Sequence, residues 1–303
     1  MDLRQRAKTC VLPVLTTGSM SVARHMTACV TAAVAIVGLG PAPALAAKSC
    51  YTFALPAMSS PVRAELDWVP FVQSLERRSG VCLRQRVSES FVQFDARMSL
   101  GEPDFAMPPP SSLIHADKLG RYTPLVTSGL SDARGVLVVR RDSGFERPAD
   151  LSQAGVVEVG VASPTAHFLS LAPQRALRRA GVRCRAIDFG NPSNVLRAVA
   201  LGRVPVGASL DMVLNDYDVA IRAQLRVIFA TEPHLRWPIA AHARVPAEVS
   251  SALTEAVSAM ANDESGRSLL RRAHLESPVR TSRAAYVATL AGEAQDDQVC
   301  DSL

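Results

Sequence analysis

The chain lacks the sequence signatures of several functional classes. It contains no Cys-x-x-Cys pair and no clustered Cys/His spacing, so nothing in it indicates a zinc site. It also contains no His-Glu-x-x-His, no Gly-x-Ser-x-Gly and no glycine-rich phosphate loop ending in lysine, the patterns typical of zinc proteases, α/β-hydrolases and nucleotide-binding enzymes. We therefore predict a protein without metal or cofactor that is not an enzyme. Since catalytic residues can lie far apart in sequence, an enzyme remains the weakest alternative.

A hydrophobic run long enough to span a membrane is also absent near the N-terminus. The run from Met26 to Leu39 has roughly 14 residues, short of the ~20 that a membrane-spanning helix needs. It follows four basic residues and precedes Ala44-Leu45-Ala46, which is the order of a secretory signal. We predict that residues 1–46 are a cleaved signal peptide and that the mature protein is exported; the periplasm as its location is implied by the resemblance described below.

The charge balance argues against nucleic acid as a partner. Residues 1–46 contain four basic residues and one acidic residue, so their removal lowers the formal net charge from +5 to +2. The remaining basic residues occur mainly as scattered arginine pairs without interleaved aromatic residues, unlike a nucleic-acid-binding patch. The mature 257 residues are enough for one large or two small domains.

Four cysteines remain after residue 46, an even number that favours disulfides in an exported chain. Three pairings are possible. Cys50 precedes a predicted strand at 51–55, and Cys82 opens another at 82–87. If these strands are parallel neighbours, their first residues lie side by side. We therefore prefer Cys50–Cys82, and Cys184–Cys300 follows by elimination.

Strand and helix patterns alternate along the mature chain. Alternation and apolar spacing predict strands at 51–55, 82–87, 104–107, 135–139, 157–161, 184–189, 204–208, 225–230 and 238–241, and helices at 61–80, 91–100, 168–179, 194–201 and 249–260. This order predicts an α/β fold with mainly parallel sheets flanked by helices.

The segment from Val157 to Phe168 is the strongest local signal for a site. Alternating valines predict a buried strand, and Ser163 followed by Pro164 is typical of a helix N-cap and first helical position. A strand that runs into a helix leaves unpaired backbone N–H groups at a positive dipole end, which suits an anion. The alternative is a capped helix without a ligand.

Several motifs occur in an order that resembles a known family. They are Leu66–Val72, Leu75–Val81, Leu100–Ala106, Val136–Gly144, Ala149–Leu151, Asn194–Gly202 and Ala284–Tyr286. In this order the chain resembles the periplasmic phosphate/phosphite/phosphonate-binding proteins of ABC importers, over essentially its whole mature length.

The resemblance implies a two-lobed type II solute-binding fold, with a small solute captured between the lobes and delivered to an ABC permease. Lobe one would comprise residues 47–136 and 232–303 with C-terminal helices, and lobe two residues 137–231. Two crossover strands, near Val136–Arg140 and Val227–Ala230, would form the hinge.

The family's ligand positions fall on altered residues. Its Ser-Thr-Ser-Gly anion loop corresponds to Pro164-Thr165-Ala166-His167, of which Thr165 keeps a hydroxyl and His167 adds a possible donor or cation. The remaining positions correspond to Phe91, Asn191 with Ser193 beside it, Asp211 and Trp237. A tetrahedral dianion needs several charge-assisted donors, and most have been replaced. We therefore expect a different small solute, anionic through a carboxylate, or aromatic.

Each of these residues has a structural alternative. Thr165 and His167 could be a first-turn hydroxyl and a solvent-facing imidazole, and Asn191 and Ser193 could cap the helix that follows. Trp237 could pack the loop around it, while the role of Asp211 rests on the resemblance alone. We expect a monomer. A receptor subunit that presents its solute to a membrane sensor kinase is the alternative to import.

Overall fold

The computed structural model describes residues 50–116, 121–291 and 299–302. The predicted signal peptide lies outside the described residues. Within them, no helix combines the length and apolarity required to cross a membrane.

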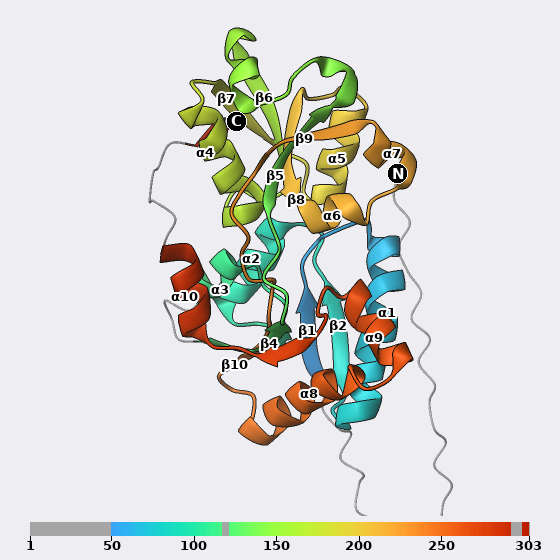
Figure 1. Ribbon diagram of the computed structural model, residues 1–303. Helices are drawn as coiled ribbons and strands as arrows, with labels where there is room; N and C mark the ends of the chain where they lie inside the picture. The colour runs from blue at the N-terminus through green and yellow to red at the C-terminus, as the bar shows by residue number, and fades with distance from the viewer. Residues whose placement is uncertain (1–49, 117–120, 292–298, 303) are drawn as a thin grey trace, which may run out of the picture. The chain divides into compact units, whose positions relative to one another are not determined.

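The described strands form two sheets of six strands each (Figure 1). The first has the order β11-β4-β10-β3-β1-β2. Its strands are β1 (Tyr51–Leu55), β2 (Leu83–Val87), β3 (Phe105–Ala106), β4 (Tyr122–Ser128), β10 (Ile239–His242) and β11 (Pro278–Arg280). β1 pairs in parallel with β2 and β3, whereas β10, β4 and β11 pair antiparallel.

The second sheet has the order β12-β7-β6-β8-β5-β9. It contains β5 (Gly135–Arg140), β6 (Val156–Val161), β7 (Arg183–Asp188), β8 (Val206–Leu210), β9 (Leu225–Ala230) and β12 (Asp301–Ser302). Three pairings are parallel and two, β5 with β8 and β5 with β9, are antiparallel. The predicted α/β class is confirmed, but both sheets are mixed, because the chain enters and leaves the second sheet on the antiparallel strands β5 and β9.

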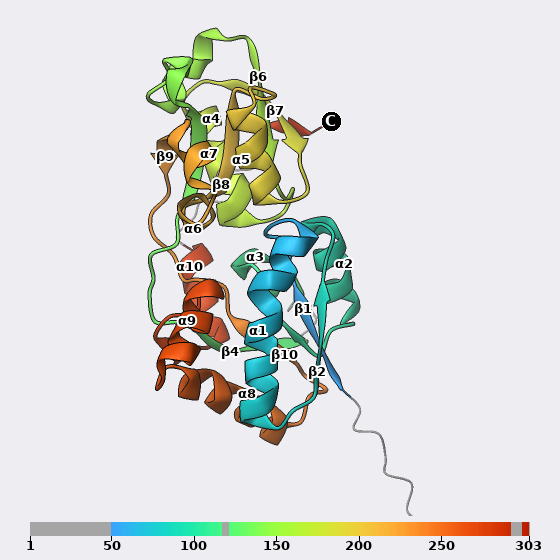
Figure 2. The same cartoon turned by 90° about the vertical axis from the view of Figure 1, so that its right-hand side faces the viewer.

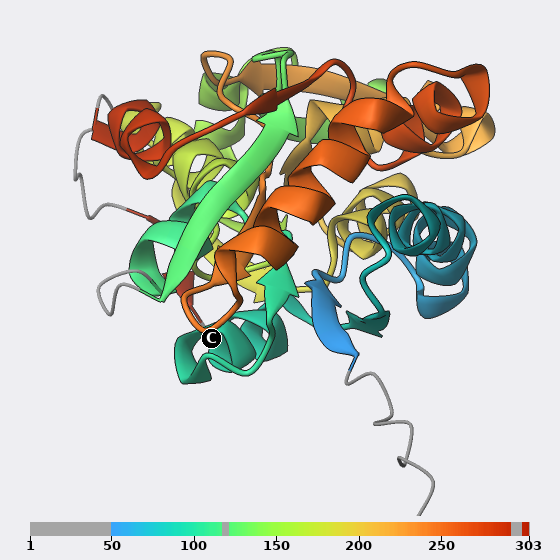
Figure 3. The ribbon, with the colours of Figure 1, turned by 90° about the horizontal axis from the view of Figure 1, so that it is seen from below.

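Helices cover both faces of each sheet. They are α1 (Pro61–Ser79), α2 (Phe91–Leu100), α3 (Pro110–Ala116), α4 (Ala172–Arg179), α5 (Pro192–Ala200), α6 (Asp211–Asn215), α7 (Val219–Ala223), α8 (Ala247–Met260), α9 (Glu264–Arg272) and α10 (Arg283–Ala291), with 3₁₀ turns at Arg141–Ser143 and Pro148–Gln153. In the first sheet, Phe53 and Leu55 pack with α1 and α8, while Ala54 between them packs with α2, α3 and α10. This alternation is the two-residue period of a strand, and Figures 2 and 3 show the helices on the two sides.

Local capping explains where the main helices begin. The Ser60 side chain accepts a hydrogen bond from the Arg63 N–H at the start of α1, and Gly80 ends that helix at φ 69°. Ser90 caps α2 and Asn191 caps α5 in the same way, each through a bond from the N–H three residues later. Each bond satisfies one of the unpaired donors of a helix N-terminus.

The helix after β6 does not begin at Pro164, the start that the Ser163-Pro164 pattern predicted. Ser163 does cap the turn, since its Oγ accepts from the N–H groups of Thr165 and Ala166 at 3.2 and 3.0 Å. The chain then forms one π-helical turn, His167–Leu171, before α4 starts at Ala172. Pro164 is therefore not the first helical residue, because its neighbours form a serine-capped turn instead.

Both predicted disulfides are present, Cys50–Cys82 and Cys184–Cys300. The first joins the starts of parallel neighbours, since Tyr51 pairs with Leu83. The second joins β7 to the C-terminal segment, where Asp301 pairs with Arg185. We placed residues 232–303 in lobe one, but the last described residues lie on the second sheet. The other lobe boundaries, and the hinge at β5 and β9, stay predictions.

Candidate ligand-binding cleft

The carboxyl ends of the parallel strands in the two sheets face each other. Three hydrogen bonds between segments that follow these strands establish this. Thr165 Oγ1 donates to Asp95 Oδ2 at 2.6 Å, the His167 N–H to Ser111 Oγ at 3.1 Å, and Ser193 Oγ to the Met58 carbonyl at 3.1 Å. Each bond joins a segment after a parallel strand of one sheet to a segment after a parallel strand of the other. In open α/β sheets this edge is where ligands bind.

We call the segment Ser163–His167, together with Asp95 and Ser111 to which it is hydrogen-bonded, the junction. Its backbone is held close to β5, since a Cβ on Gly135 would lie 2.0 Å from the Phe168 carbonyl oxygen. A π-helical turn, here His167–Leu171, is often found at functional sites. The junction is therefore fixed by backbone packing and by the Ser163 cap.

Thr165 is exposed, yet its hydroxyl is engaged by a carboxylate from the opposite sheet. Asp95 lies one turn after Phe91 on α2, and its second oxygen, Oδ1, is buried without a hydrogen-bond partner in the described structure. The place that the resemblance assigns to an anion is thus next to the chain's own carboxylate.

His167 is half-buried and makes ring and polar contacts. Its ring lies edge-on to Phe168 at 4.7 Å, and its Nδ1 is 3.3 Å from Nη1 of Arg175. The predicted alternative of a solvent-facing imidazole does not hold, because neighbouring residues cover the ring. Whether His167 contacts a ligand stays a prediction.

A second histidine, His234, stacks on the ring of Phe168, which His167 contacts edge-on. Its ring is parallel to that of Phe168 with centroids 3.6 Å apart, and Nδ1 lies 2.8 Å from the Leu235 carbonyl oxygen. Burial, the largest influence, lowers the pKa of His234 to about 4. The imidazole is therefore neutral at neutral pH, and its buried Nε2 has no partner in the described structure.

The structure uses the predicted polar residues at helix ends. Asn191 is buried and caps α5, with its Oδ1 2.8 Å from the Asn194 N–H. Asp211 Oδ1 accepts from the N–H groups of Arg134 and Met212 at 3.0 and 2.7 Å. The capping alternative is thus confirmed for Asn191, and a further ligand role for these two residues stays a prediction.

Phe91 and Trp237 come together although they are far apart in sequence. Both are buried, and their rings meet edge to face at a centroid distance of 5.8 Å. They belong to one apolar cluster that also contains Met107, which follows β3, and Phe168, in the π-helical turn after β6. The packing alternative for Trp237 is confirmed.

Three buried serine hydroxyls at the facing edges have no partner in the described structure: Ser88 after β2, Ser112 in α3 and Ser209 near the end of β8. Buried polar atoms are nearly always hydrogen-bonded, to protein, water or a ligand. The sequence analysis missed these serines and Asp95. The only signal was their position after strands, since Asp95 approaches Thr165 from 70 residues away.

A metal centre is not indicated. Within residues 50–116, 121–291 and 299–302, no group of three or more His, Cys, Asp or Glu side chains could hold an ion.

Two α/β sheets whose carboxyl edges face each other define the class of two-lobed solute-binding proteins. Residues 53–286 match the family described as ABC transporter, phosphonate, periplasmic substrate-binding protein. Because this match covers most of the chain, the protein belongs to that family, whose members are solute-binding proteins and not enzymes. The family is typically periplasmic and works with an ABC permease. A sequence search of curated proteins found no match.

Solved structures with the same fold include two phosphonate-binding proteins. A binding-protein component of an ABC phosphonate transporter from Pseudomonas aeruginosa has a TM-score of 0.72 and 14% identity, over 80% of this chain and 84% of that one. PhnD1 from Prochlorococcus marinus, in complex with methylphosphonate, has a TM-score of 0.69 and 12% identity, over 78% and 94%. XAC2383 from Xanthomonas citri, bound to chloride, has a TM-score of 0.61 and 18% identity, over 80% and 96%.

Proposed function

We propose that this substrate-binding protein captures, at the junction, a small solute with at most one negative charge and a flat apolar part, such as an aromatic carboxylate. The contact that carries the proposal is Thr165 Oγ1 to Asp95 Oδ2 at 2.6 Å. It directs a carboxylate at the hydroxyl that the family uses for its oxyanion. The solute would then pass to an ABC permease.

The electrostatic argument can be given a magnitude. Two unit charges about 4 Å apart repel by roughly 4 kcal/mol at an effective dielectric constant of about 20. A phosphonate dianion at Thr165 would meet about twice that repulsion from Asp95. Because this repulsion scales with the charge of the solute, a monoanion is tolerated more easily than a dianion.

Neutral groups supply the other contacts of the proposed site. Ser88, Ser112 and Ser209 have hydroxyls that can donate or accept hydrogen bonds. These hydroxyls are buried and have no hydrogen-bond partner within the described residues, so a solute could supply one. Phe91 and Trp237 belong to the apolar cluster that also contains Phe168. Aromatic edges and faces favour a flat apolar solute.

A thermal-shift screen of the mature protein tests the proposal, since a ligand that binds only the folded state raises the melting temperature. The panel comprises methylphosphonate, phosphite, aliphatic carboxylates and aromatic carboxylates. We expect an aromatic monocarboxylate to give the largest shift. A dominant shift with methylphosphonate or phosphite would refute the assignment of solute class.

Variants test the location. Ser112→Ala and Thr165→Ala should each lower the affinity for the solute that the screen identifies. Ser258→Ala, on the exposed side of α8, is the matched control and should leave this affinity unchanged. Asp95→Asn should raise the affinity for methylphosphonate. If neither Ser112→Ala nor Thr165→Ala changes the affinity, the solute binds elsewhere. The sensor alternative stays a prediction, which neighbouring permease or sensor-kinase genes would decide.

A further inference from the structure

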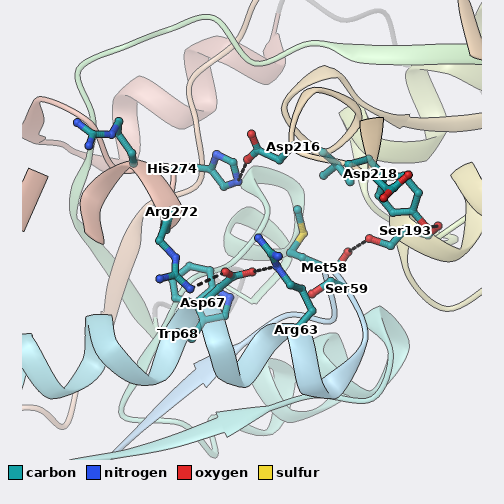
Figure 4. Close-up of a pocket in the computed structure, with 13 residues that line it drawn as sticks. Met58, Ser59, Arg63, Asp67, Trp68, Ser193, Asp216, Asp218, Arg272 and His274 are labelled. Carbon is teal, nitrogen blue, oxygen red and sulfur yellow. Dashed lines mark hydrogen bonds and ion pairs between the residues drawn. The ribbon is translucent and has the colours of Figure 1, made fainter. Parts of the chain in front are cut away.

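A cavity of about 430 Å³ lies between elements of the two sheets, and no residue from 163 to 167 lines it (Figure 4). Its walls come from the loop after β1, from α1, from α9 and the residues after it, and from the α5, α6 and α7 region. Of the predicted site residues only Ser193 lines it. The volume is in the range of small-molecule sites.

One wall is basic. Arg63 Nε and Arg272 Nη2 both contact the Asp67 carboxylate, at 2.7 and 2.9 Å. Two guanidinium groups thus share one carboxylate, and Arg271, whose partner Glu264 lies outside the cavity, adds a third cation, so this wall is net positive. Within the described residues Arg63 uses only its Nε hydrogen for this pair, so its terminal nitrogens have donors left for a ligand.

The opposite wall is acidic. Asp216 Oδ2 lies 3.4 Å from His274 Nε2. Burial, the largest influence, lowers the pKa of His274, so the imidazole is neutral at neutral pH and does not compensate the Asp216 charge. Asp218, also on this side, accepts hydrogen bonds from the N–H groups that begin α7.

Apolar and aromatic groups also line the cavity. Trp68 is buried beside the basic wall, and Met58 and Val213 also line the cavity. Tyr217 donates its hydroxyl to the Ser193 carbonyl oxygen at 3.0 Å, which fixes its ring on the side of the second sheet. The cavity therefore presents basic, acidic and apolar groups to one enclosed volume.

His274 occupies a backbone position that favours glycine. Its φ is 54°, directly after the C-cap of α9, and the Leu275 N–H returns to the Leu270 carbonyl oxygen at 2.8 Å. This is a Schellman ending, in which the left-handed residue is usually glycine because it has no side chain to strain. A side chain kept at this position shapes the wall of the cavity.

We propose that this cavity is a second ligand site and that it binds a zwitterionic solute of the amino-acid type. The carboxylate of the solute lies against Arg63 and Arg272, and its ammonium group against Asp216. Arginine suits a carboxylate because its planar fork gives two parallel hydrogen bonds. A ligand held this way contacts elements of both sheets at once and stabilises their closed arrangement.

Isothermal titration of the mature protein with the twenty common L-amino acids, one at a time, tests the site. The amino acid that binds most tightly is then compared with its carboxamide and its N-acetyl derivative, each of which removes one charge. We expect both derivatives to bind at least about tenfold more weakly, because each loses a charge-assisted contact. Equal binding of either derivative, or no binding by any amino acid, would overturn the proposal.

Substitutions locate the binding. Arg63→Gln and Asp216→Asn should each raise the Kd of that amino acid about tenfold or more, with circular dichroism to establish that both fold. Arg267→Gln and Asp142→Asn, in exposed ion pairs outside the cavity, are the charge-matched controls. Thr165→Ala should leave amino-acid binding unchanged. If Thr165→Ala weakens it and the cavity variants do not, the amino acid binds at the junction and the second site is refuted.

Discussion

Acidification should destabilise the protein through His234. In the folded state burial lowers the pKa of His234 from 6.5 to about 4. A buried imidazole with a depressed pKa contributes its full stability above about pH 6.5, and this contribution is lost as the pH falls towards 4. The cause is burial, because protonation would place a charge in a site shielded from water, where the ring's hydrogen bond is to the Leu235 carbonyl oxygen.

The expected loss follows from the size of the shift. A shift of one pKa unit corresponds to about 1.4 kcal/mol, so the displacement from 6.5 to about 4 amounts to roughly 3 kcal/mol. The free energy of unfolding should fall by about 1.4 kcal/mol per pH unit between pH 6 and 4.5 on account of this residue alone. The lowered pKa values of His274 and His242 add losses of the same sign.

The comparison of wild type with His234→Asn isolates the effect. Asparagine can keep the hydrogen bond to the Leu235 carbonyl oxygen but cannot be protonated in this range. Urea unfolding at pH 7.5, 6.5, 5.5 and 4.5 should show a difference between the two proteins that shrinks or reverses as the pH falls. A constant difference over this range would refute the reasoning, since the loss of stacking on Phe168 alone does not depend on pH.

Three further changes should affect stability in proportion to the contacts described. Replacing Cys184 and Cys300 by serine should lower the free energy of unfolding by about 5 kcal/mol according to the loop-entropy relation, because the bridge closes a separation of 116 residues. Guanidinium unfolding would measure this loss, and a loss below about 1 kcal/mol would contradict the relation. Gly135→Ala should prevent stable folding, since the new methyl group would lie 2.0 Å from the Phe168 carbonyl oxygen; a melting temperature close to wild type would disprove that close approach. Asn191→Ala should cost about 1 kcal/mol through the lost cap of α5, and Asn191→Ser should restore most of it.

Local signals were sufficient for much of the fold. Ser60 and Gly80 mark both ends of α1, and α2 begins and ends at the predicted residues. The cysteine pairing was also accessible, because it followed from two neighbouring parallel strands. These features depend on contacts between residues close in sequence or on a single strand pairing.

Other features depend on partners that no local pattern announces. β4 contains Pro124, which disfavours an interior strand. It is accommodated because Pro124 pairs with Ala240 where the register of β10 shifts. β12 has only two residues and exists through its pairing with β7, over one hundred residues earlier. Tertiary contacts override weak propensity in both cases.

The same distinction applies to the candidate sites. The order of strands and helices predicted that the segment Val157–Phe168 forms one wall of a cleft, which stays a prediction. It could not reveal that Asp95 approaches Thr165, nor that Arg63 and Arg272 converge on Asp67 from α1 and α9. Such contacts require the approach of helices that are distant in sequence, so residue type alone does not indicate them.

The two disulfides bear on how the chain matures if it is exported N-terminus first. Each joins cysteines that follow one another along the chain after residue 46, Cys50 with Cys82 and Cys184 with Cys300. An oxidase that acts on cysteines in their order of emergence would form both native bridges without a later exchange. The first can close while most of the protein is still to be translocated. The second must wait for Cys300, so the second sheet acquires its covalent link only after the strands β5 to β9 have been translocated.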